Sequence, residues 1–419
     1  MPSKTPVLRD GMPLPTIRGA ALLAAALSAG LSLAEIAATL AGPFANDAEM
    51  LAASLDTAIL AFLSGQHALG RALQADVLAQ AQIFRVAAGE AAARAARPLR
   101  LLGFVAPGDL QTNMPIEFIT AHLPVQLDLV FVEAHSGLPP VLPEHDVAIC
   151  LVGDSRPDIL CNLGYLLDGW PKPVLNDPAK VLGGHIERLS REGLARLFAG
   201  SRTVMAPETS TLSRAELQSA LASEGAIERL PPGGKWPILM RPENSHAGWL
   251  LKKLETAAEL AVYLDCVAAD LFTLTSFVDY RDADGQYRKL RVALINGEAH
   301  LAHMAISSNW MIHYANAGMV DDAAKRDEEA AAMAEFADGF AKRHEAALDE
   351  ISSALGLDYV LIDCAEAPDG RLLLFEVEMA AIIHMLDPVE TFPYKPPRMT
   401  KIFNSFGRML QEAAGLVAA

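Results

Sequence analysis

The chain has few cysteines, few aromatic residues and a deficit of positive charge. Its 419 residues include four cysteines, and only 6% are aromatic. The cysteines, at positions 150, 161, 266 and 364, lack the close spacing of metal or redox motifs, so we expect buried free thiols in a reducing, cytoplasmic compartment. Lys and Arg number 34 against 51 Asp and Glu, giving a net charge of −17. A nucleic-acid partner is therefore not expected, because phosphate binding needs concentrated Lys and Arg.

Long hydrophobic spans and motifs for covalent catalysis are also missing. The apolar segment 19–30 is too short to cross a bilayer, and it runs into Ser32-Leu33-Ala34-Glu35, a capping pattern that opens another helix. We therefore expect no membrane association. The sequence has no Gly-Lys-Ser/Thr phosphate loop and no convincing Ser-His-Asp or Cys-His arrangement.

What the chain does have is enough apolar material for a large core. Hydrophobic residues make up 52% of it, and its length allows about three domains. Residues 1–97 are rich in Ala and Leu at helical spacing, which predicts about four helices forming a cap or dimerisation region. Residues 98–173 alternate apolar runs with helix-like segments, which predicts a small α/β domain with a parallel sheet.

The most informative segment lies near the C-terminal end and predicts an acidic hairpin. Two apolar runs flank Asp369-Gly370, a strong signal for a tight turn. Glu376 and Glu378 are two residues apart and point to one face of a strand, and Asp363 can oppose them on the partner strand. Three converging carboxylates repel one another and favour a hard cation such as Mg²⁺. The alternative is an amphipathic hairpin whose acids face solvent.

Four segments precede this hairpin in a suggestive order. A strand bearing a cation, 236–242, leads to a small-residue loop at 243–248; a strand at 274–280 and a basic strand at 288–297 follow. That order resembles the ATP-grasp superfamily, in particular carboxylate–amine ligases of the glutathione synthetase and ribosomal-protein glutamate ligase type. The resemblance covers roughly residues 98–410 and is one of order and spacing more than of identity.

The resemblance implies an α/β fold of the α+β grasp kind. An N-terminal helical segment and a small parallel α/β domain would precede two α+β subdomains that clasp ATP. The ATP-grasp domain would then span 174–419, with an ATP-binding lid subdomain at about 185–275 and a catalytic subdomain at about 276–410. The implied cofactors are ATP and Mg²⁺, with two ions expected and Mn²⁺ as an alternative.

The resemblance also assigns ATP-binding roles. Arg241 stands where the family usually has a phosphate-binding Lys, and it keeps the charge but offers a planar fork. Lys180, near a helix start, is the candidate for an earlier nucleotide-binding Lys, with a solvated Lys as the alternative. The remaining positions are the phosphate-covering loop residues Ser245, His246 and Gly248, and the adenine- and ribose-contacting hinge residues Ser276, Phe277, Val278 and Asp279.

Catalytic and metal-binding roles fall on the later strands. Lys289 and Arg291 match the basic strand that faces the transferred phosphoryl group. Asp363, Glu376 and Glu378 match the metal positions. The last of these departs from the family, which commonly has Asn there, and the extra negative charge should strengthen Mg²⁺ binding or reflect altered chemistry.

The substrate side is less well defined. The polar and aromatic segment 303–314 would line the pocket, with Asn309 and His313 as substrate contacts, and His384 faces the same cavity in this interpretation. The alternative is an aromatic segment packed on the helical cap. We expect the acidic segment 321–329 to be a solvated helix or loop with no special role.

Together these assignments imply an ATP-dependent, ADP-forming ligase that makes a C–N bond through an acyl phosphate. Its substrates would be small molecules or peptides, and a homodimer is expected because related enzymes often dimerise. Two alternatives remain open. One is a small-molecule kinase, and the other is a non-catalytic nucleotide-binding regulatory protein, suggested by Arg241 and Glu378 at positions where Lys and Asn are usual.

Overall fold

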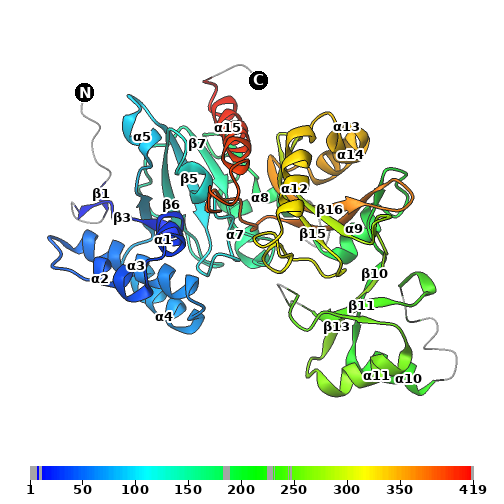
Figure 1. Ribbon diagram of the computed structural model, residues 1–419. Helices are drawn as coiled ribbons and strands as arrows, with labels where there is room; N and C mark the ends of the chain where they lie inside the picture. Colours follow the sequence, from blue (N-terminus) through cyan, green and yellow to red (C-terminus); the bar gives the residue numbers. More distant parts are fainter. Residues whose placement is uncertain are drawn as a thin grey trace.

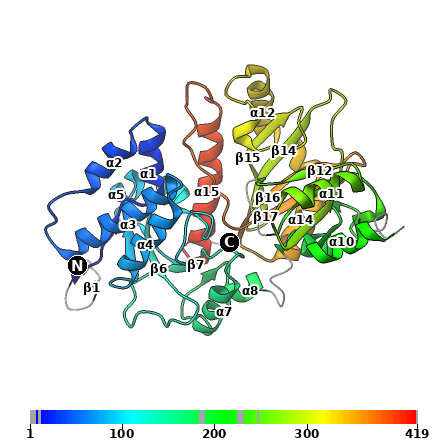
Figure 2. The ribbon, with the colours of Figure 1, turned by 90° about the horizontal axis from the view of Figure 1, so that it is seen from below.

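The computed structural model describes residues 7–8, 12–182, 189–223, 230, 232–243, 245 and 248–416. It is a mixed α/β structure, which confirms the predicted fold class. The described strands form sheets of six, four and five strands, beside a two-stranded ribbon of β1 (Val7–Leu8) and β2 (Met12–Pro13). Figures 1 and 2 show the six-stranded sheet and the N-terminal helices on one side of the molecule and the other two sheets on the opposite side.

The six-stranded sheet contains the parallel core that the apolar runs predicted. β5 pairs in parallel with β6 and β7, and β7 pairs in parallel with β8. β4 is antiparallel to β6, and β3 pairs with β4 in parallel. In spatial order the strands are β3 (Thr16–Ile17), β4 (Ile83–Val86), β6 (Val125–Phe131), β5 (Leu99–Val105), β7 (Val147–Cys150) and β8 (Val174–Leu175).

The N-terminal segment is helical, as expected, but it also extends this sheet through β3 and β4. Its capping signal is real: Ser32 accepts a hydrogen bond from the Glu35 amide, and the Glu35 carboxylate accepts one from the Ser32 amide. The helices of this layer are α1 (Gly19–Ser28), α2 (Leu33–Leu40), α3 (Asp47–Leu63), α4 (His67–Leu78) and α5 (Glu90–Arg94). Among the described residues, none of the helices combines the length and apolarity that a membrane crossing requires.

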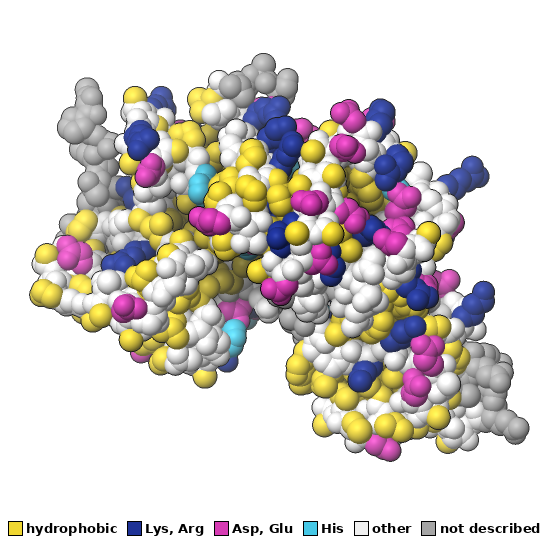
Figure 3. All heavy atoms as spheres, viewed as in Figure 1, with side chains coloured by type: hydrophobic (Ala, Val, Ile, Leu, Met, Phe, Trp, Pro, Cys, Tyr) yellow, Lys and Arg dark blue, Asp and Glu magenta, His cyan; other side chains and the backbone are white. Residues whose placement is uncertain are grey.

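The four-stranded sheet forms a lobe with its own core. Its antiparallel strands are β10 (Thr209–Ser213), β13 (Leu271–Ser276), β11 (Ile238–Pro242) and β12 (Lys252–Leu254), with α10 (Arg214–Ala222) and α11 (Ala257–Cys266) against them. Ile238, Met240, Leu260, Phe272 and Leu274 are fully buried in this core. Figure 3 shows the lobe standing apart from the rest of the molecule, with acidic and basic side chains interspersed over the visible face.

The five-stranded sheet carries the predicted hairpin. Its strands, in spatial order, are β15 (Glu298–Ser307), β14 (Tyr287–Ile295), β16 (Tyr359–Glu366), β17 (Leu372–Glu378) and β9 (Val204–Met205). β16 and β17 are antiparallel around Gly370, which has the positive φ of 82° that such a turn favours. The Asp369-Gly370 hairpin prediction is therefore confirmed.

The remaining helices pack on these sheets or join them. They are α6 (Glu117–Thr120), α7 (Pro157–Leu166), α8 (Pro178–Leu182), α9 (Arg191–Leu197), α12 (Ala323–Glu335), α13 (Phe340–Arg343), α14 (Glu345–Leu355) and α15 (Lys395–Ala413). α15 lies between the six-stranded and the five-stranded sheets in both ribbon views (Figures 1 and 2). Phe403 stacks on His122 with 5.2 Å between ring centroids, and Phe406 meets Tyr359 of β16 at 5.1 Å. The C-terminal helix therefore joins the two layers.

All four cysteines are free thiols, as expected. Cys150 and Cys364 are buried, and burial raises the pKa of the Cys150 thiol to about 12. Cys161 and Cys266 are exposed, so the expectation of burial was wrong for these two. Cys161 lies in α7 and Cys266 ends α11, and the outward face of a helix is not readable from an apolar run alone.

Candidate functional site

The predicted catalytic and metal positions lie side by side on one face of the five-stranded sheet. Arg291 of β14 is the register partner of Asp363 of β16, which in turn pairs with Glu376 of β17. Cross-strand partners share a face, and Lys289 and Glu378 join them because each is two residues along its strand. One pairing that is distant in sequence, β14 with β16, and one local hairpin, β16 with β17, thus assemble the cluster.

Asp363 is buried between two cations. Arg291 donates to it through Nε at 2.7 Å and Nη2 at 3.0 Å, and Lys289 Nζ lies 2.7 Å from Oδ2. Burial alone would raise the pKa of Asp363, but Lys289 and Arg291 hold it well below its usual range. Asp363 is therefore ionised and neutralised by the protein's own cations. Its role as a metal ligand stays a prediction.

Glu376 and Glu378 form a carboxylate pair that protein cations compensate less completely. Arg191, at the first residue of α9, donates to Glu376 Oε2, and Lys289 Nζ is 3.8 Å from Oε1. Burial, followed by the charge of Glu376, raises the pKa of Glu378 to about 7. A divalent cation bound to Glu376 and Glu378 would offset the repulsion between the two carboxylates and the cost of burying the charge of Glu378.

The carboxylates of this site can bind Mg²⁺ only together with oxygen atoms from a bound substrate. Among the described residues, no group of three or more His, Cys, Asp or Glu side chains is placed to hold a metal ion. Mg²⁺ is commonly bound by one or two carboxylates together with substrate phosphates and water. Glu376 and Glu378 match that pattern, with phosphate oxygens as the missing ligands.

Arg241 reaches the same region from the four-stranded lobe. Burial, followed by the charge of Arg191, lowers the pKa of Arg241 to about 10, while Glu376 and Glu378 oppose this shift. Its Nε donates to Ser245 Oγ at 3.0 Å, and that hydroxyl donates to the Pro242 carbonyl at 2.7 Å. Arg241 and the start of the predicted phosphate loop are thus fixed to each other. His246 lies outside the described residues.

Gly248 brings this loop against the predicted substrate segment. A Cβ on Gly248 would lie 2.6 Å from His313 Nε2, and its φ of +71° is a conformation that side chains disfavour. This close approach brings the predicted phosphate loop into contact with His313, although the two are far apart in the sequence. Burial lowers the pKa of His313, and Lys289 lowers it further, so the ring is neutral beside the basic strand.

Two backbone amides of the predicted hinge, those of Ser276 and Phe277, already donate hydrogen bonds within the four-stranded lobe. The Ser276 amide donates to the Glu208 carbonyl at 2.8 Å, and the Phe277 amide donates to the Pro237 carbonyl at 3.2 Å. Adenine contact at this hinge would therefore have to use carbonyl groups or Val278. Its role stays a prediction.

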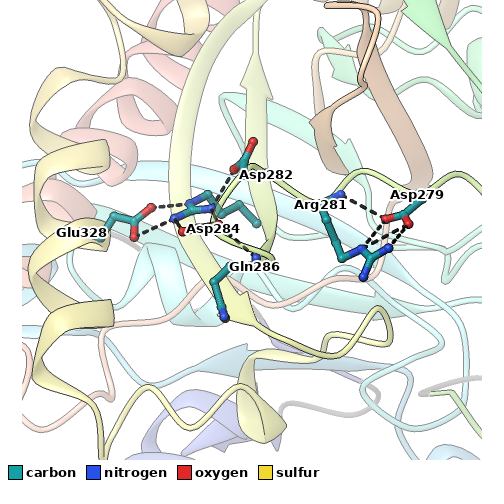
Figure 4. A network of polar contacts seen from close by, with 7 residues as sticks. Asp279, Arg281, Asp282, Asp284, Gln286 and Glu328 are labelled. Atoms are coloured by element: carbon teal, nitrogen blue, oxygen red, sulfur yellow. Dashed lines mark hydrogen bonds and ion pairs between the residues drawn. The ribbon is translucent and has the colours of Figure 1, made fainter.

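Asp279 is engaged by a neighbouring cation. Arg281 donates to its carboxylate through Nε at 2.9 Å and Nη2 at 2.5 Å, as Figure 4 shows. The rest of that network joins Asp284 and Glu328 through Arg288, which ties the loop before β14 to α12. A ribose hydroxyl would have to share Asp279 with Arg281.

Lys180 is anchored near the start of β16. Its Nζ lies 3.7 Å from Asp358 Oδ1. The neighbouring Asn176 amide donates to Asp358 Oδ2 at 2.7 Å, and its side chain donates to the Tyr359 carbonyl at 2.7 Å. The segment is thus held against the catalytic sheet, and the nucleotide-binding role of Lys180 stays a prediction.

The other two predicted substrate contacts have local hydrogen bonds. Asn309 Oδ1 accepts from the Met311 amide at 3.1 Å, which closes the loop after β15. His384 Nδ1 accepts from the Leu386 amide at 3.2 Å. Burial lowers the pKa of His384, and Arg291 is among the charges that act on it. The roles of Asn309 and His384 stay predictions.

A buried polar cluster beside this face of the five-stranded sheet was not predicted from the sequence. Glu329 is fully buried and accepts hydrogen bonds from Tyr314 OH at 3.0 Å and Tyr394 OH at 2.6 Å. Lys395 is only 4% exposed, and its Nζ lies 2.8 Å from Asp387 Oδ2 and 4.1 Å from the Tyr314 ring centroid. The expectation that the segment ending at Glu329 is wholly solvated was therefore wrong. Charge alone suggested exposure, because its aromatic partners lie far away in sequence.

Comparisons with known proteins give distant likenesses. No family model and no curated protein matches the sequence. The D-Ala:D-Ser ligase VanG from Enterococcus faecalis aligns over 76% of this chain and 99% of its own, at 13% identity and a TM-score of 0.44. A RimK domain ATP-grasp protein from Sphaerobacter thermophilus aligns over 74% and 99%, at 18% identity and a TM-score of 0.40.

A third solved structure is of the same kind. The D-alanine–D-alanine ligase from Bacillus anthracis, complexed with ATP, aligns over 76% of this chain and 97% of its own, at 11% identity and a TM-score of 0.44. The chain is thus similar to these proteins over about three quarters of its length. Likenesses this distant carry no argument about activity, which has to come from the site itself.

Proposed function

We propose that this protein is an ATP- and Mg²⁺-dependent carboxylate–amine ligase that acts through an acyl phosphate on amino-acid or peptide substrates. One observation carries the proposal: basic side chains from two sheets and α9 converge on a carboxylate pair. The cations are Arg191, Arg241, Lys289 and Arg291, and the carboxylates are Glu376 and Glu378.

This arrangement has the charge pattern that a magnesium nucleotide requires. Phosphate oxygens need several cations placed around them, because catalysis of phosphoryl transfer is mainly positioning and electrostatic stabilisation. Glu376 and Glu378 would hold Mg²⁺, which would supply positive charge against the phosphate groups. Arg241 and the loop at Ser245 and Gly248 would hold the phosphates from the lobe side.

In the proposed reaction the substrate carboxylate attacks the γ-phosphorus of ATP. A new O–P bond forms, the bond to the β,γ-bridging oxygen breaks, and ADP leaves with its electron pair. Lys289 and Arg291 lie on the sheet face where they can oppose the charge that spreads over the transferred oxygens. An amine then attacks the acyl carbon, the C–N bond forms and inorganic phosphate leaves.

The neutral ring of His313, beside the basic strand, favours a ligase over a kinase. His313 is held neutral near Lys289 and contacts the predicted phosphate loop at Gly248. A kinase needs only the phosphoryl acceptor, whereas a ligase needs a second subsite next to the phosphates for an amine. A neutral imidazole suits that second subsite because it can accept a hydrogen bond from an N–H group.

One observation favours the non-catalytic alternative. Asp363, the residue expected to bind a metal, is fully occupied by Lys289 and Arg291. A protein that only senses nucleotide would bind ATP and release no ADP.

The test is ADP release with Mg²⁺ across pooled amino acids, dipeptides and small carboxylic acids, with mass spectrometry of the products. ADP together with a condensed product would support the ligase. ADP with a stable phosphorylated compound would identify a kinase, and ATP binding without ADP would identify a sensor. Glu376→Gln serves as the inactive control.

A further inference from the structure

His303 opens the predicted pocket-lining segment 303–314 but has no role of its own in the proposed function. It lies in β15 and is the register partner of Arg291, so its side chain shares the face that carries Lys289 and Asp363. The residue is half-buried. Its ring lies 4.6 Å, centroid to centroid, from the ring of Tyr314.

The Nδ1 atom of His303 has no hydrogen-bond partner among the residues that the structure describes. Within the described part of the chain, this nitrogen is shielded from solvent and makes no hydrogen bond. Buried polar atoms are nearly always paired, and an unpaired one calls for an explanation such as a ligand that completes the site. His313 Nε2, at the Gly248 contact, is in the same condition. Two imidazoles near the basic strand thus each have a free position.

Burial and the neighbouring cations keep the His303 ring neutral. Burial is the main cause that lowers its pKa, and Arg291, Lys395 and Lys289 lower it further, whereas Asp363 opposes them. Its pKa therefore lies well below the ordinary value of 6.5. A neutral imidazole at physiological pH has a lone pair available, which can accept a hydrogen bond or a proton.

We propose that His303 binds the amine acceptor of the ligation and takes its proton as the C–N bond forms. The amine lone pair attacks the acyl carbon of the acyl phosphate, the C–O bond to phosphate breaks, and phosphate leaves with that electron pair. The proton lost by the nitrogen passes to His303, which then releases it to solvent. The inference rests on the proposed ligase function and assigns the acceptor class as a primary amine.

The geometry explains why His303, and not a neighbouring carboxylate, would accept the proton. Asp363 is tied to Lys289 and Arg291, and Glu376 is tied to Arg191, so both carboxylates are already engaged by protein cations. His303 is adjacent to the same cations without being paired to them. It stands two strands away from Asp363 and directly beside Arg291, which is proposed to face the transferred phosphoryl group.

The experiment separates acyl-phosphate formation from amide formation. Full-length protein is incubated with ATP, Mg²⁺ and a pool of L- and D-amino acids, either alone or with hydroxylamine, a nucleophile that is neutral near pH 7 and needs no base. Hydroxamate reports the acyl phosphate, and condensed product reports attack by an amine. The variant is His303→Asn, which keeps a polar atom near the Nδ1 position but cannot take a proton.

We expect the variant to form hydroxamate within about twofold of wild type and to lose condensed product about 100-fold at pH 7, the usual scale of general base catalysis. Its ligation should recover relative to wild type as pH rises, because hydroxide then increasingly takes the proton that His303 would otherwise accept. The control is His300→Asn on the same strand, since His300 bonds Ser405 of α15 at 3.0 Å and should leave both products unchanged.

Three results would overturn the inference. Equal losses of hydroxamate and condensed product would show that His303 acts in folding or phosphoryl transfer. Unchanged ligation would show that it has no part in proton transfer. In both cases the ligase proposal would survive. Failure of the wild-type protein to form either product would overturn the ligase function and this inference together.

Discussion

Arg291 and Asp363 face each other across β14 and β16 and are joined by two hydrogen bonds, of 2.7 and 3.0 Å. Lys289 completes the group at 2.7 Å from the same carboxylate. The pairing lies at the centre of the catalytic face and links the predicted phosphoryl-facing strand to the predicted metal hairpin. Its first consequence is for stability, because a buried charge that loses its partner is costly.

Asp363→Ala should therefore destabilise the protein by about 3 kcal/mol or more, since it leaves two buried cations facing each other. Urea unfolding followed by circular dichroism measures this change. The matched control is Asp369→Ala at the exposed hairpin turn, which should cost far less because its ion pair with Arg371 is open to solvent. An unfolding midpoint of Asp363→Ala equal to that of wild type would contradict the buried pairing.

Glu378 should make stability depend on pH. Its pKa is raised from 4.5 to about 7 by burial and by Glu376, so the folded protein prefers the protonated form. Such a group costs nothing below its unfolded pKa; the cost grows as pH rises from that value to the folded pKa and stays constant above it. Glu378→Gln should match wild type in stability near pH 4 and exceed it by about 3 kcal/mol near pH 8.

Urea unfolding of both proteins at several pH values without Mg²⁺ measures this difference. The same variant should bind MgATP more weakly, because it loses one of two carboxylates proposed for the metal. A stability difference that does not change with pH would show that Glu378 is ionised in the folded protein throughout this range.

Gly248→Ala tests the contact between the proposed phosphate loop and His313. The added Cβ would meet His313 Nε2 at 2.6 Å, so either the loop or the His313 ring must shift, and both belong to the proposed site. We expect MgATP binding to weaken about tenfold, because small displacements of positioning groups have effects of this size or larger. Isothermal titration calorimetry measures the affinity.

Gly285→Ala is the control for backbone strain. Gly285 also has a positive φ, of 77°, but a Cβ there meets nothing within 4 Å. Both variants should lose about 1 kcal/mol of stability from strain. Equal MgATP affinities for the two variants would show that the Gly248 loop does not contact the nucleotide.

Arg191→Ala tests whether Arg191, which was not predicted from the sequence, belongs to the proposed phosphate site. This arginine bonds Glu376 in the structure and lowers the pKa of Arg241, so it belongs to the proposed phosphate site. We expect MgATP affinity to fall about tenfold, consistent with the loss of one charged hydrogen-bonding group. Arg196→Ala on the same helix is the control, since Arg196 is exposed and bonds Glu192. Equal affinities for the two variants would remove Arg191 from the site.

The sequence predicts the parts of this site that depend on local pattern. Alternation and the Asp369-Gly370 turn were enough to place Asp363 opposite Glu376, which the register confirms. The occupation of Asp363 by Lys289 and Arg291 was not predicted, because it depends on β14 lying beside β16 across an intervening stretch of about seventy residues.

Other members of the site have no local signal at all. Arg191 begins a short amphipathic helix and reaches Glu376 only through the packing of α9 near β17. Lys395 follows an aromatic and proline-rich segment, and its burial results from Tyr314 and Asp387, which lie in other loops. Within the described part of the chain, the distinguishing feature of His303 is an unpaired ring nitrogen, which cannot be read from the sequence.

The most direct test of the ligase account follows an oxygen atom. Amino acids labelled with ¹⁸O in the carboxylate are incubated with ATP, Mg²⁺ and the protein, and the released phosphate is analysed by mass spectrometry. An acyl phosphate transfers one carboxylate oxygen to phosphate, so the account predicts one ¹⁸O per phosphate together with ADP and an amide product. Amide formation with unlabelled phosphate, or ATP binding with no phosphate release, would contradict it.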